Sequence, residues 1–126
     1  MTLPPYSERV LTLFRELPGA GPPDAGPGML AAGESGSPGQ GAWVRFEARV
    51  EGGRIVDCGF RAWGCPHTLA ASALARSWLV ASPGGACEAI RLAAELDVPA
   101  AKMGRLLVVE DAANALLAAA ARVQYE

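Results

Sequence analysis

Residues Val56–Val80, VDCGFRAWGCPHTLAASALARSWLV, carry the pattern that decides the fold. Their first part, through Trp63, is typical of a β-strand. Gly64 and Cys65 then form a tight corner, and Pro66 suits the first turn of a helix, where no backbone N–H is needed. The stretch predicts a strand, a corner and a helix. It places the thiol of Cys65 at a helix N-terminus, where unpaired N–H groups and the helix dipole favour the thiolate.

A partner strand is predicted just before this stretch. Trp43–Glu51 alternates between apolar and charged residues, and Gly52-Gly53 supplies a hairpin turn into Arg54–Trp63. The apolar face of each strand is read from the two-residue period. On the first strand it comprises Val44, Phe46, Ala48 and Val50, and on the second Val56, Cys58, Phe60 and Ala62. Antiparallel strands with one apolar face are expected to be covered by helices on that face.

Helices are expected both before and after the hairpin in the sequence. Tyr6–Leu17 has Ser7 as its cap and is stopped by Pro18. The helix from Pro66 is expected to end at the segment Ser82-Pro83-Gly84-Gly85. Its predicted apolar side comprises Leu69, Ala70, Ala73, Leu74, Ser77 and Trp78. Glu88–Leu96 and Arg105–Gln124 are the remaining helix candidates.

The segment Pro18–Ala42 contains 8 Gly and 5 Pro in 25 residues. This composition predicts a long, irregular and flexible connection at about residues 18–42. The predicted class is therefore α+β. We expect a single domain over residues 1–126, in which a small antiparallel sheet of about three strands is packed by helices.

Composition excludes several classes of protein. The 126 residues include 11 Lys and Arg that are scattered along the chain, which argues against nucleic-acid binding. No apolar stretch has the length of a membrane span, and no secretory signal follows Met1. Three cysteines fit reduced thiols better than a secreted disulfide framework, so a cytoplasmic protein is expected.

Cys65 is the leading candidate for chemistry, either as a thiolate that binds metal or accepts sulfur, or as a small residue that fits a tight corner. His67 is a candidate metal ligand beside it, or a solvated polar residue of the first turn. Two ligands fall short of the roughly four that a structural zinc requires. Cys58 is expected to pack in the core, and Cys87 to be structural or inert.

The acidic candidates show no spacing typical of a catalytic carboxylate pair. They are Asp57, Glu110 and Asp111, and the last two are expected to have a dipole or capping role. No Ser-His-Asp pattern, phosphate-binding loop or dinucleotide fingerprint is present. We therefore expect a protein that is not an enzyme.

Four collinear pieces of the chain resemble IscU/NifU-type iron–sulfur cluster scaffold proteins. The opening stretch resembles the family segment V-D-A-x-F-x-x-x-G-C-x-x-x-x-A-S-S-x-x-x-x-x-W. Tyr6–Val10 resembles Y-S-E-K-V, and Gly36–Ala42 resembles G-A-P-A-C-G-D. Val98–Lys102, followed by Glu110-Asp111-Ala112, resembles L-P-P-V-K…A-E-D-A. The resemblance covers nearly the whole chain and implies the family's sheet-and-helix fold and a role in iron–sulfur cluster biogenesis.

The resemblance implies a ligand set of three cysteines assisted by an aspartate and a histidine. At those positions this chain keeps Cys65, and has Gln40, Ala42 and the pair Gly104-Arg105 in place of the others. A guanidinium cannot ligate metal. An iron–sulfur cluster, iron or zinc would thus have Cys65 and His67 as ligands, too few in a monomer. A symmetric homodimer could pool two copies of both residues.

The partners implied by the resemblance are a cysteine desulfurase or other iron–sulfur assembly proteins, met through Tyr6, Pro99 and Lys102. An alternative is a degenerate scaffold that binds no cluster and serves as an accessory or regulatory module. In that hypothesis Arg105 fills the space of a metal and holds the Cys65 thiolate as an ion pair. Ranked last is Cys65 as an enzymatic nucleophile or sulfur carrier, because His67 is the only nearby base that the sequence offers.

Overall fold

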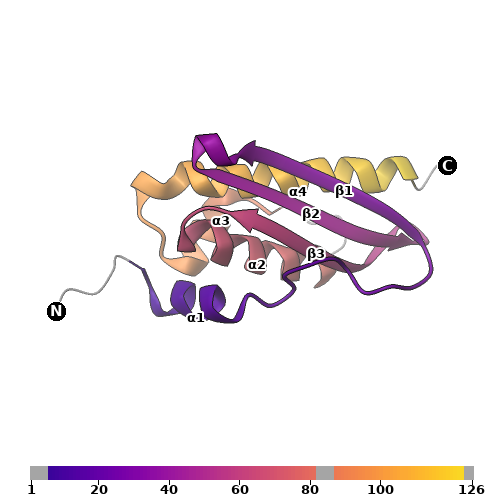
Figure 1. Ribbon diagram of the computed structural model, residues 1–126, viewed down its shortest axis with the longest axis horizontal. Helices are drawn as coiled ribbons and strands as arrows, with labels where there is room; N and C mark the ends of the chain where they lie inside the picture. Colours follow the sequence, from indigo (N-terminus) through magenta and orange to yellow (C-terminus); the bar gives the residue numbers. More distant parts are fainter. Residues whose placement is uncertain (1–5, 82–86, 124–126) are drawn as a thin grey trace.

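The structure is a computed structural model that describes residues 6–81 and 87–123 (Figure 1). Two predicted helix ends lie outside the described residues: the segment Ser82-Pro83-Gly84-Gly85, expected to end the helix from Pro66, and Gln124, the expected end of the last helix. The elements in chain order are α1 (Glu8–Glu16), β1 (Met29–Ser37), the short 3-10 helix η1 (Pro38–Gln40), β2 (Ala42–Glu51), β3 (Arg54–Trp63), α2 (Pro66–Ala81), α3 (Ala89–Leu96), the 3-10 helix η2 (Ala100–Lys102) and α4 (Met103–Val123).

The three strands form one antiparallel sheet in the order β1-β2-β3, and helices cover one face of it. Helix α4 packs on β1 and β2, while α2 packs on β3 and α1 lies on α2. The apolar residues of β2 are buried and its charged residues alternate with them, as the sequence predicts. The α+β class with a small antiparallel sheet is thus confirmed.

Strand β1 corrects the expectation that residues 18–42 form only an irregular connection. Met29–Ser37 pairs along the whole of β2, from Met29 opposite Val50 to Ser37 opposite Ala42. Its small residues let α4 approach closely, because a Cβ at Gly33 would collide with the backbone of Leu116. Glycine is tolerated here because β1 is an edge strand that is held by long-range pairing and by a helix above it.

Strand β3 corrects one predicted core position. The register shifts between Arg49 and Val50, so that Arg49 pairs with Asp57 while Val50 pairs with Ile55. The extra residue is Val56, which is 39% exposed, whereas Ile55 is buried. A β-bulge of this kind reverses the inward and outward positions beyond it. Cys58 and Phe60 are buried as predicted.

Helix α2 is buried on more sides than a single apolar stripe predicts. Eight of the nine residues from His67 to Ala75 are buried, including Thr68 and Ser72, because the sheet, α1 and α4 surround the helix. Ser77, predicted on the apolar side, is exposed and donates its hydroxyl to the carbonyl of Leu74 (2.6 Å). Helix α1 begins as expected at Ser7, whose hydroxyl oxygen accepts from the N–H of Val10 (3.2 Å).

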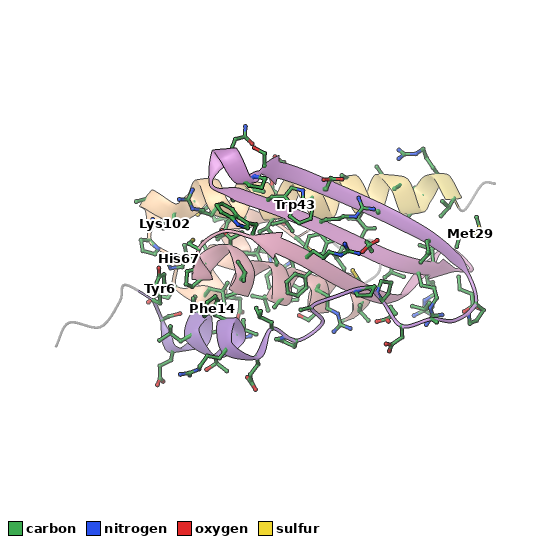
Figure 2. The ribbon with its side chains drawn as sticks, in the orientation of Figure 1. Tyr6, Phe14, Met29, Trp43, His67 and Lys102 are labelled. Atoms are coloured by element: carbon green, nitrogen blue, oxygen red, sulfur yellow. The ribbon has the colours of Figure 1, made fainter. Side chains whose placement is uncertain are left out.

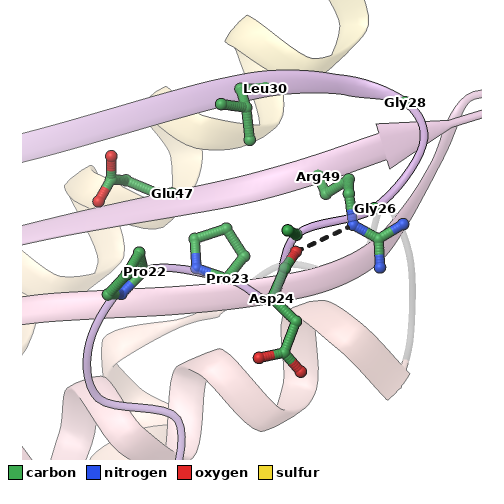
Figure 3. A pocket seen from close by; sticks show the side chains of 9 residues that line it. Pro22, Pro23, Asp24, Gly26, Gly28, Leu30, Glu47 and Arg49 are labelled. Atoms are coloured by element: carbon green, nitrogen blue, oxygen red, sulfur yellow. Dashed lines mark hydrogen bonds between the residues drawn. The ribbon is translucent and has the colours of Figure 1, made fainter.

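The segment between α1 and β1 passes along the outer edge of the sheet and is tied to it. The N–H of Gly21 donates to the carbonyl of Phe60 (2.8 Å), and the N–H of Phe60 donates to the carbonyl of Gly19 (3.2 Å). Further along, the guanidinium of Arg49 donates to the carbonyls of Asp24 (3.3 Å) and Pro27 (3.0 Å). This arch encloses an open pocket of about 430 Å³ over Leu30 and Glu47 (Figure 3).

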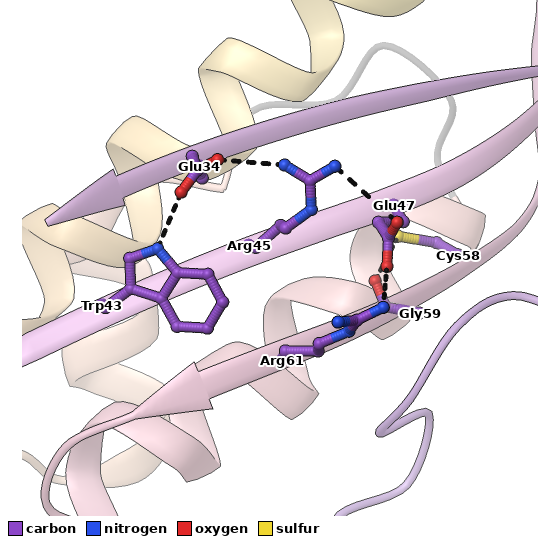
Figure 4. Close-up of polar contacts among 7 residues, drawn as sticks. All are labelled: Glu34, Trp43, Arg45, Glu47, Cys58, Gly59 and Arg61. Carbon is purple, nitrogen blue, oxygen red and sulfur yellow. Dashed lines mark hydrogen bonds and ion pairs between the residues drawn. The ribbon is translucent and has the colours of Figure 1, made fainter. Parts of the chain in front are cut away.

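Charged side chains form a chain of contacts across the outer face of the sheet (Figure 4). Glu34 accepts from the indole N–H of Trp43 (2.8 Å) and from Arg45 (3.0 Å). Glu47 contacts Arg45 (3.7 Å) and Arg61 (3.2 Å). Exposed ion pairs of this kind contribute little stability individually. They give the helix-free face of the sheet a polar surface that matches the predicted alternation.

Candidate thiol site at the N-terminus of α2

Cys65 lies at the corner between β3 and α2. Gly64 turns the chain with a φ of 154°, and a Cβ there would come within 2.8 Å of the Thr68 hydroxyl. The carbonyl of Cys65 accepts from the N–H of Leu69 (3.2 Å), so the cysteine is the residue from which α2 starts. Its side chain is half-buried, with Sγ 3.7 Å from Oγ1 of Thr68. The thiol therefore stands at the helix N-terminus, as the sequence predicts.

The surroundings of Cys65 favour its thiolate. Partial burial raises the pKa of Cys65, but the backbone and hydroxyl of Thr68, the backbone of His67 and the side chain of Arg105 together lower it further, so the net pKa lies below the ordinary value. Hydrogen bonds to the charged form of a group stabilise that form. The sequence did not single out Thr68, because its contact with the sulfur depends on how the chain turns at Gly64 and Cys65.

Arg105 reaches this corner from the first turn of α4. A Cβ built on Gly41, the residue after η1, would lie 3.4 Å from Nη1 of Arg105, so the guanidinium rests against that turn. Its Nε is buried and has no hydrogen-bond partner within the described part of the chain. The structure thus brings three distant segments together around the guanidinium: the turn after Gln40, the corner at Cys65 and the start of α4. Gly104 beside it faces open space.

The other two cysteines have the opposite environment. Burial raises the pKa of Cys58 to about 12 and that of Cys87 to about 11. Cys58 donates its thiol to the carbonyl of Gly59 (3.5 Å), and Cys87 donates to the carbonyl of Ala75 (3.6 Å). Both are fully buried in the core. They are packing residues, as the sequence indicates.

His67 is not the solvated residue that a first-turn position suggests. Its side chain is fully buried, and its ring lies 4.8 Å from the ring of Tyr6 at an angle of 59° (Figure 2). The His67 ring therefore packs against Tyr6, two residues before α1, whereas Cys65 is partly exposed. A ligand role for His67 would require its ring to leave this packing.

The residues predicted to meet partners lie on segments that the core helices hold in place. Tyr6 is half-buried against His67, and the Ser7 hydroxyl donates to the carbonyl of Leu96 (2.6 Å). Pro99 is exposed at the start of η2, and its carbonyl accepts from the N–H of Lys102 (2.9 Å). In Figure 2, Tyr6 and Lys102 lie toward the same end of the molecule.

The acidic candidates have structural partners. Asp57 accepts from the N–H groups of Asp24 (2.6 Å) and Cys58 (2.9 Å) and forms an ion pair with Arg76 (3.3 Å). Glu110 accepts from the N–H of Ala89 (2.7 Å) and so caps α3. The capping role predicted for Glu110 is therefore found, on the neighbouring helix rather than on its own.

Among the described residues, the corner carries one thiol that could ligate a metal, that of Cys65. Across residues 6–81 and 87–123, no three His, Cys, Asp or Glu side chains are grouped so that they could hold a metal. Oγ1 of Thr68 lies 3.7 Å from the sulfur, and the guanidinium of Arg105 has no lone pair with which to ligate a metal. An iron–sulfur cluster usually needs four thiolates or close substitutes. Cys65 supplies one.

The chain belongs to the family described as the NifU-like N terminal domain, whose model matches residues 5–124. It is 28% identical over 117 residues to the iron–sulfur cluster assembly scaffold protein IscU of Haemophilus influenzae, covering 90% of this chain and 93% of that one. It is 30% identical over 117 residues to a Drosophila melanogaster protein called iron–sulfur cluster assembly enzyme IscU, covering 90% of this chain and 76% of that one. Both matches agree with the resemblance found in the sequence.

The fold is also that of a solved structure. A protein from Fervidobacterium islandicum AW-1, described as an iron–sulfur cluster assembly scaffold protein for the SUF system, superposes with a TM-score of 0.62 at 15% identity. The match covers 89% of this chain and 96% of that one. In the described part of this chain, no helix is long and apolar enough to cross a membrane.

Proposed function

We propose that this chain acts in iron–sulfur cluster biogenesis as a scaffold-like protein, through the single retained thiol of Cys65 and through partner-binding surfaces. The observation that carries the proposal is the position of that thiol. Within a NifU-like fold, Cys65 is partly exposed at a helix N-terminus and is surrounded by groups that favour its thiolate. Relatives of similar length are named as iron–sulfur cluster assembly scaffolds.

The chemistry at the corner supports a binding role rather than catalysis. The Thr68 hydroxyl contacts the Cys65 sulfur, and Arg105 is the other side chain that lowers the pKa of Cys65; neither is a general base at neutral pH. His67 offers its backbone N–H to the sulfur, while its ring is buried against Tyr6. We therefore propose a cytoplasmic protein that is not an enzyme.

The proposed partner is a cysteine desulfurase or another iron–sulfur assembly protein. Tyr6, Pro99 and Lys102 would contribute to the contact, since Tyr6 and Lys102 are partly exposed and Pro99 is exposed, just before α1 and around η2. Lys102 adds a positive charge to the end of the molecule that carries Arg105. The complementary partner surface would be acidic.

A binding experiment with the desulfurase of the same cell tests this function. Size-exclusion chromatography with light scattering should detect a complex with the wild-type chain, and Lys102→Glu should weaken it. Arg122→Glu is the matched control, because Arg122 is an exposed cation in the last turn of α4, whereas Lys102 immediately precedes the first turn of that helix. In cells, loss of the chain should lower the activity of iron–sulfur enzymes, and Cys65→Ser should not restore it. Full restoration by Cys65→Ser together with no complex would refute the proposal.

A further inference from the structure

We infer that Arg105 closes the Cys65 corner to metal: its guanidinium stands where a further ligand would have to stand, so one copy of this chain holds neither a metal ion nor a cluster there. The inference rests on the proposed function, because it describes how the same site works in cluster biogenesis. It concerns whether the site binds a metal ion or a cluster, and not which protein partner the chain binds.

The geometry provides the first step. Three segments meet at the corner, namely the turn at Gly41, the start of α2 at Cys65 and the first turn of α4 at Arg105. Nη1 of Arg105 lies 3.4 Å from the position of a Cβ on Gly41, and the Arg105 side chain is one of the groups that lower the pKa of Cys65. Gly41 has a φ of 93°, a conformation that favours glycine. The guanidinium therefore lies beside both the Gly41 turn and the Cys65 corner.

The chemistry of the surrounding groups provides the second step. A metal ion needs lone pairs, and the Cys65 sulfur is instead met by N–H groups of His67 and Thr68 and by the guanidinium. A guanidinium keeps its charge at any pH at which proteins are folded and has no lone pair to donate. It repels a cation and competes with it for the thiolate. The corner is complementary to an anion, the thiolate itself.

The same argument bears on a site shared between two copies. A symmetric dimer that joins two Cys65 thiols would also bring together two Arg105 side chains, because an isologous interface repeats every residue. The histidines that would complete such a site are buried against Tyr6. Dimerisation therefore doubles the positive charge at the corner while adding only one thiolate, that of the second Cys65.

A cobalt titration tests the inference on the full chain, under a phosphine reductant and without oxygen. Cobalt(II) is the probe because its thiolate complexes absorb visibly. The double variant Gln40→Cys/Arg105→Cys places new thiols on η1, before the Gly41 turn, and on the first turn of α4. It should bind one cobalt per chain, at least roughly 100-fold more tightly than the wild type. The matched control is Gln40→Cys/Arg122→Cys, which has the same composition with the second thiol far along α4, and it should bind like the wild type.

Two results would overturn the inference. One is wild-type uptake of one cobalt per chain with thiolate absorption that Cys65→Ser abolishes. The other is a folded double variant that binds cobalt no better than its control. If the double variant does not fold, the wild type and Cys65→Ser decide alone, by iron and sulfide content after anaerobic reconstitution: equal, negligible contents support the inference, and Cys65-dependent iron overturns it. The desulfurase complex is measured separately, so either failure is recognised as such.

Discussion

Cys58 and Cys65 lie seven residues apart on one strand–corner–helix unit, yet the pKa values of their thiols are shifted in opposite directions. Burial raises the pKa of Cys58 to about 12, although the charge of Arg76 acts against this. The pKa of Cys65 is also raised by burial, but N–H groups and Arg105 lower it further than burial raises it. The difference teaches that the helix start and the arginine, rather than the residue type, create the reactive thiol.

Asp57 extends the comparison because it is an anion held by the same kind of device. Burial raises its pKa, while the N–H groups of Asp24 and Cys58 and the charge of Arg76 bring the net pKa below the ordinary value. At Asp57 these interactions hold the segment that precedes β1 against strand β3 and helix α2. At Cys65 the same combination of amides and an arginine holds a nucleophile at the surface.

The largest expected effect is the difference in alkylation between the cysteines. In the folded protein at pH 7, iodoacetamide should modify Cys65 while Cys58 and Cys87 react at least roughly 1,000-fold more slowly. Burial and a raised pKa both suppress the two core thiols. Peptide mapping by mass spectrometry, with and without urea, measures the three rates. Comparable native rates at Cys58 and Cys65 would remove the basis of the comparison.

Stability should respond to the two cysteines in the reverse order. Cys58→Ser buries a hydroxyl in place of a thiol and should lower the free energy of unfolding by about 1–3 kcal/mol. Cys65→Ser, at the half-buried corner, should change it by less than about 0.5 kcal/mol. Urea unfolding followed by circular dichroism measures both. A larger loss at Cys65 than at Cys58 would show that the corner carries more of the fold than we infer.

The Asp57 anion should be visible in the pH dependence of stability. Asp57→Asn removes the ion pair with Arg76 and should cost about 1–2 kcal/mol at pH 7. Because the folded pKa of Asp57 lies below its unfolded value, its contribution is present above that unfolded value, about 3.9, and is lost as the pH falls through the folded pKa. The difference between the two proteins should therefore shrink toward pH 3. A constant difference across that range would contradict the charge argument.

The smallest effect is expected from removing the guanidinium at the corner. Arg105→Met should slow alkylation of Cys65 at pH 7 about fivefold and move the midpoint of the rate–pH curve upward. The midpoint of the wild type should lie below that of an ordinary thiol, because the rate follows the thiolate. Arg122→Met is the control and should leave the curve in place. Identical curves for both variants would mean that Arg105 does not act on Cys65.

The sequence was sufficient for elements whose signals are local. The alternation in Trp43–Glu51, the Gly52-Gly53 turn and the proline at the start of α2 each depend on a few neighbouring residues, and the structure has the hairpin and the helix there. Ser7 caps α1 as predicted. The position of Cys65 at a helix N-terminus follows from the same local pattern.

Elements that depend on distant partners were not predictable in this way. Strand β1 has the composition of a loop and becomes a strand through pairing with β2 and close packing under α4. Val56 points outward because of a register shift against β2, and nothing in its own segment indicates the bulge. His67 is buried because α1 and Tyr6 pack over the start of α2.

The sequence by itself determined the α+β class, the hairpin and the thiol at the start of α2, because hydrophobic period and helix-start chemistry are written in adjacent residues. It also indicated, through the resemblance, that Arg105 replaces a ligand. Only the tertiary structure decided where the guanidinium goes, since Gly41, Cys65 and Arg105 meet through the packing of β2, α2 and α4. The physical reason is range: secondary structure follows from neighbours along the chain, whereas the charge balance at a site is set by side chains that only folding brings together.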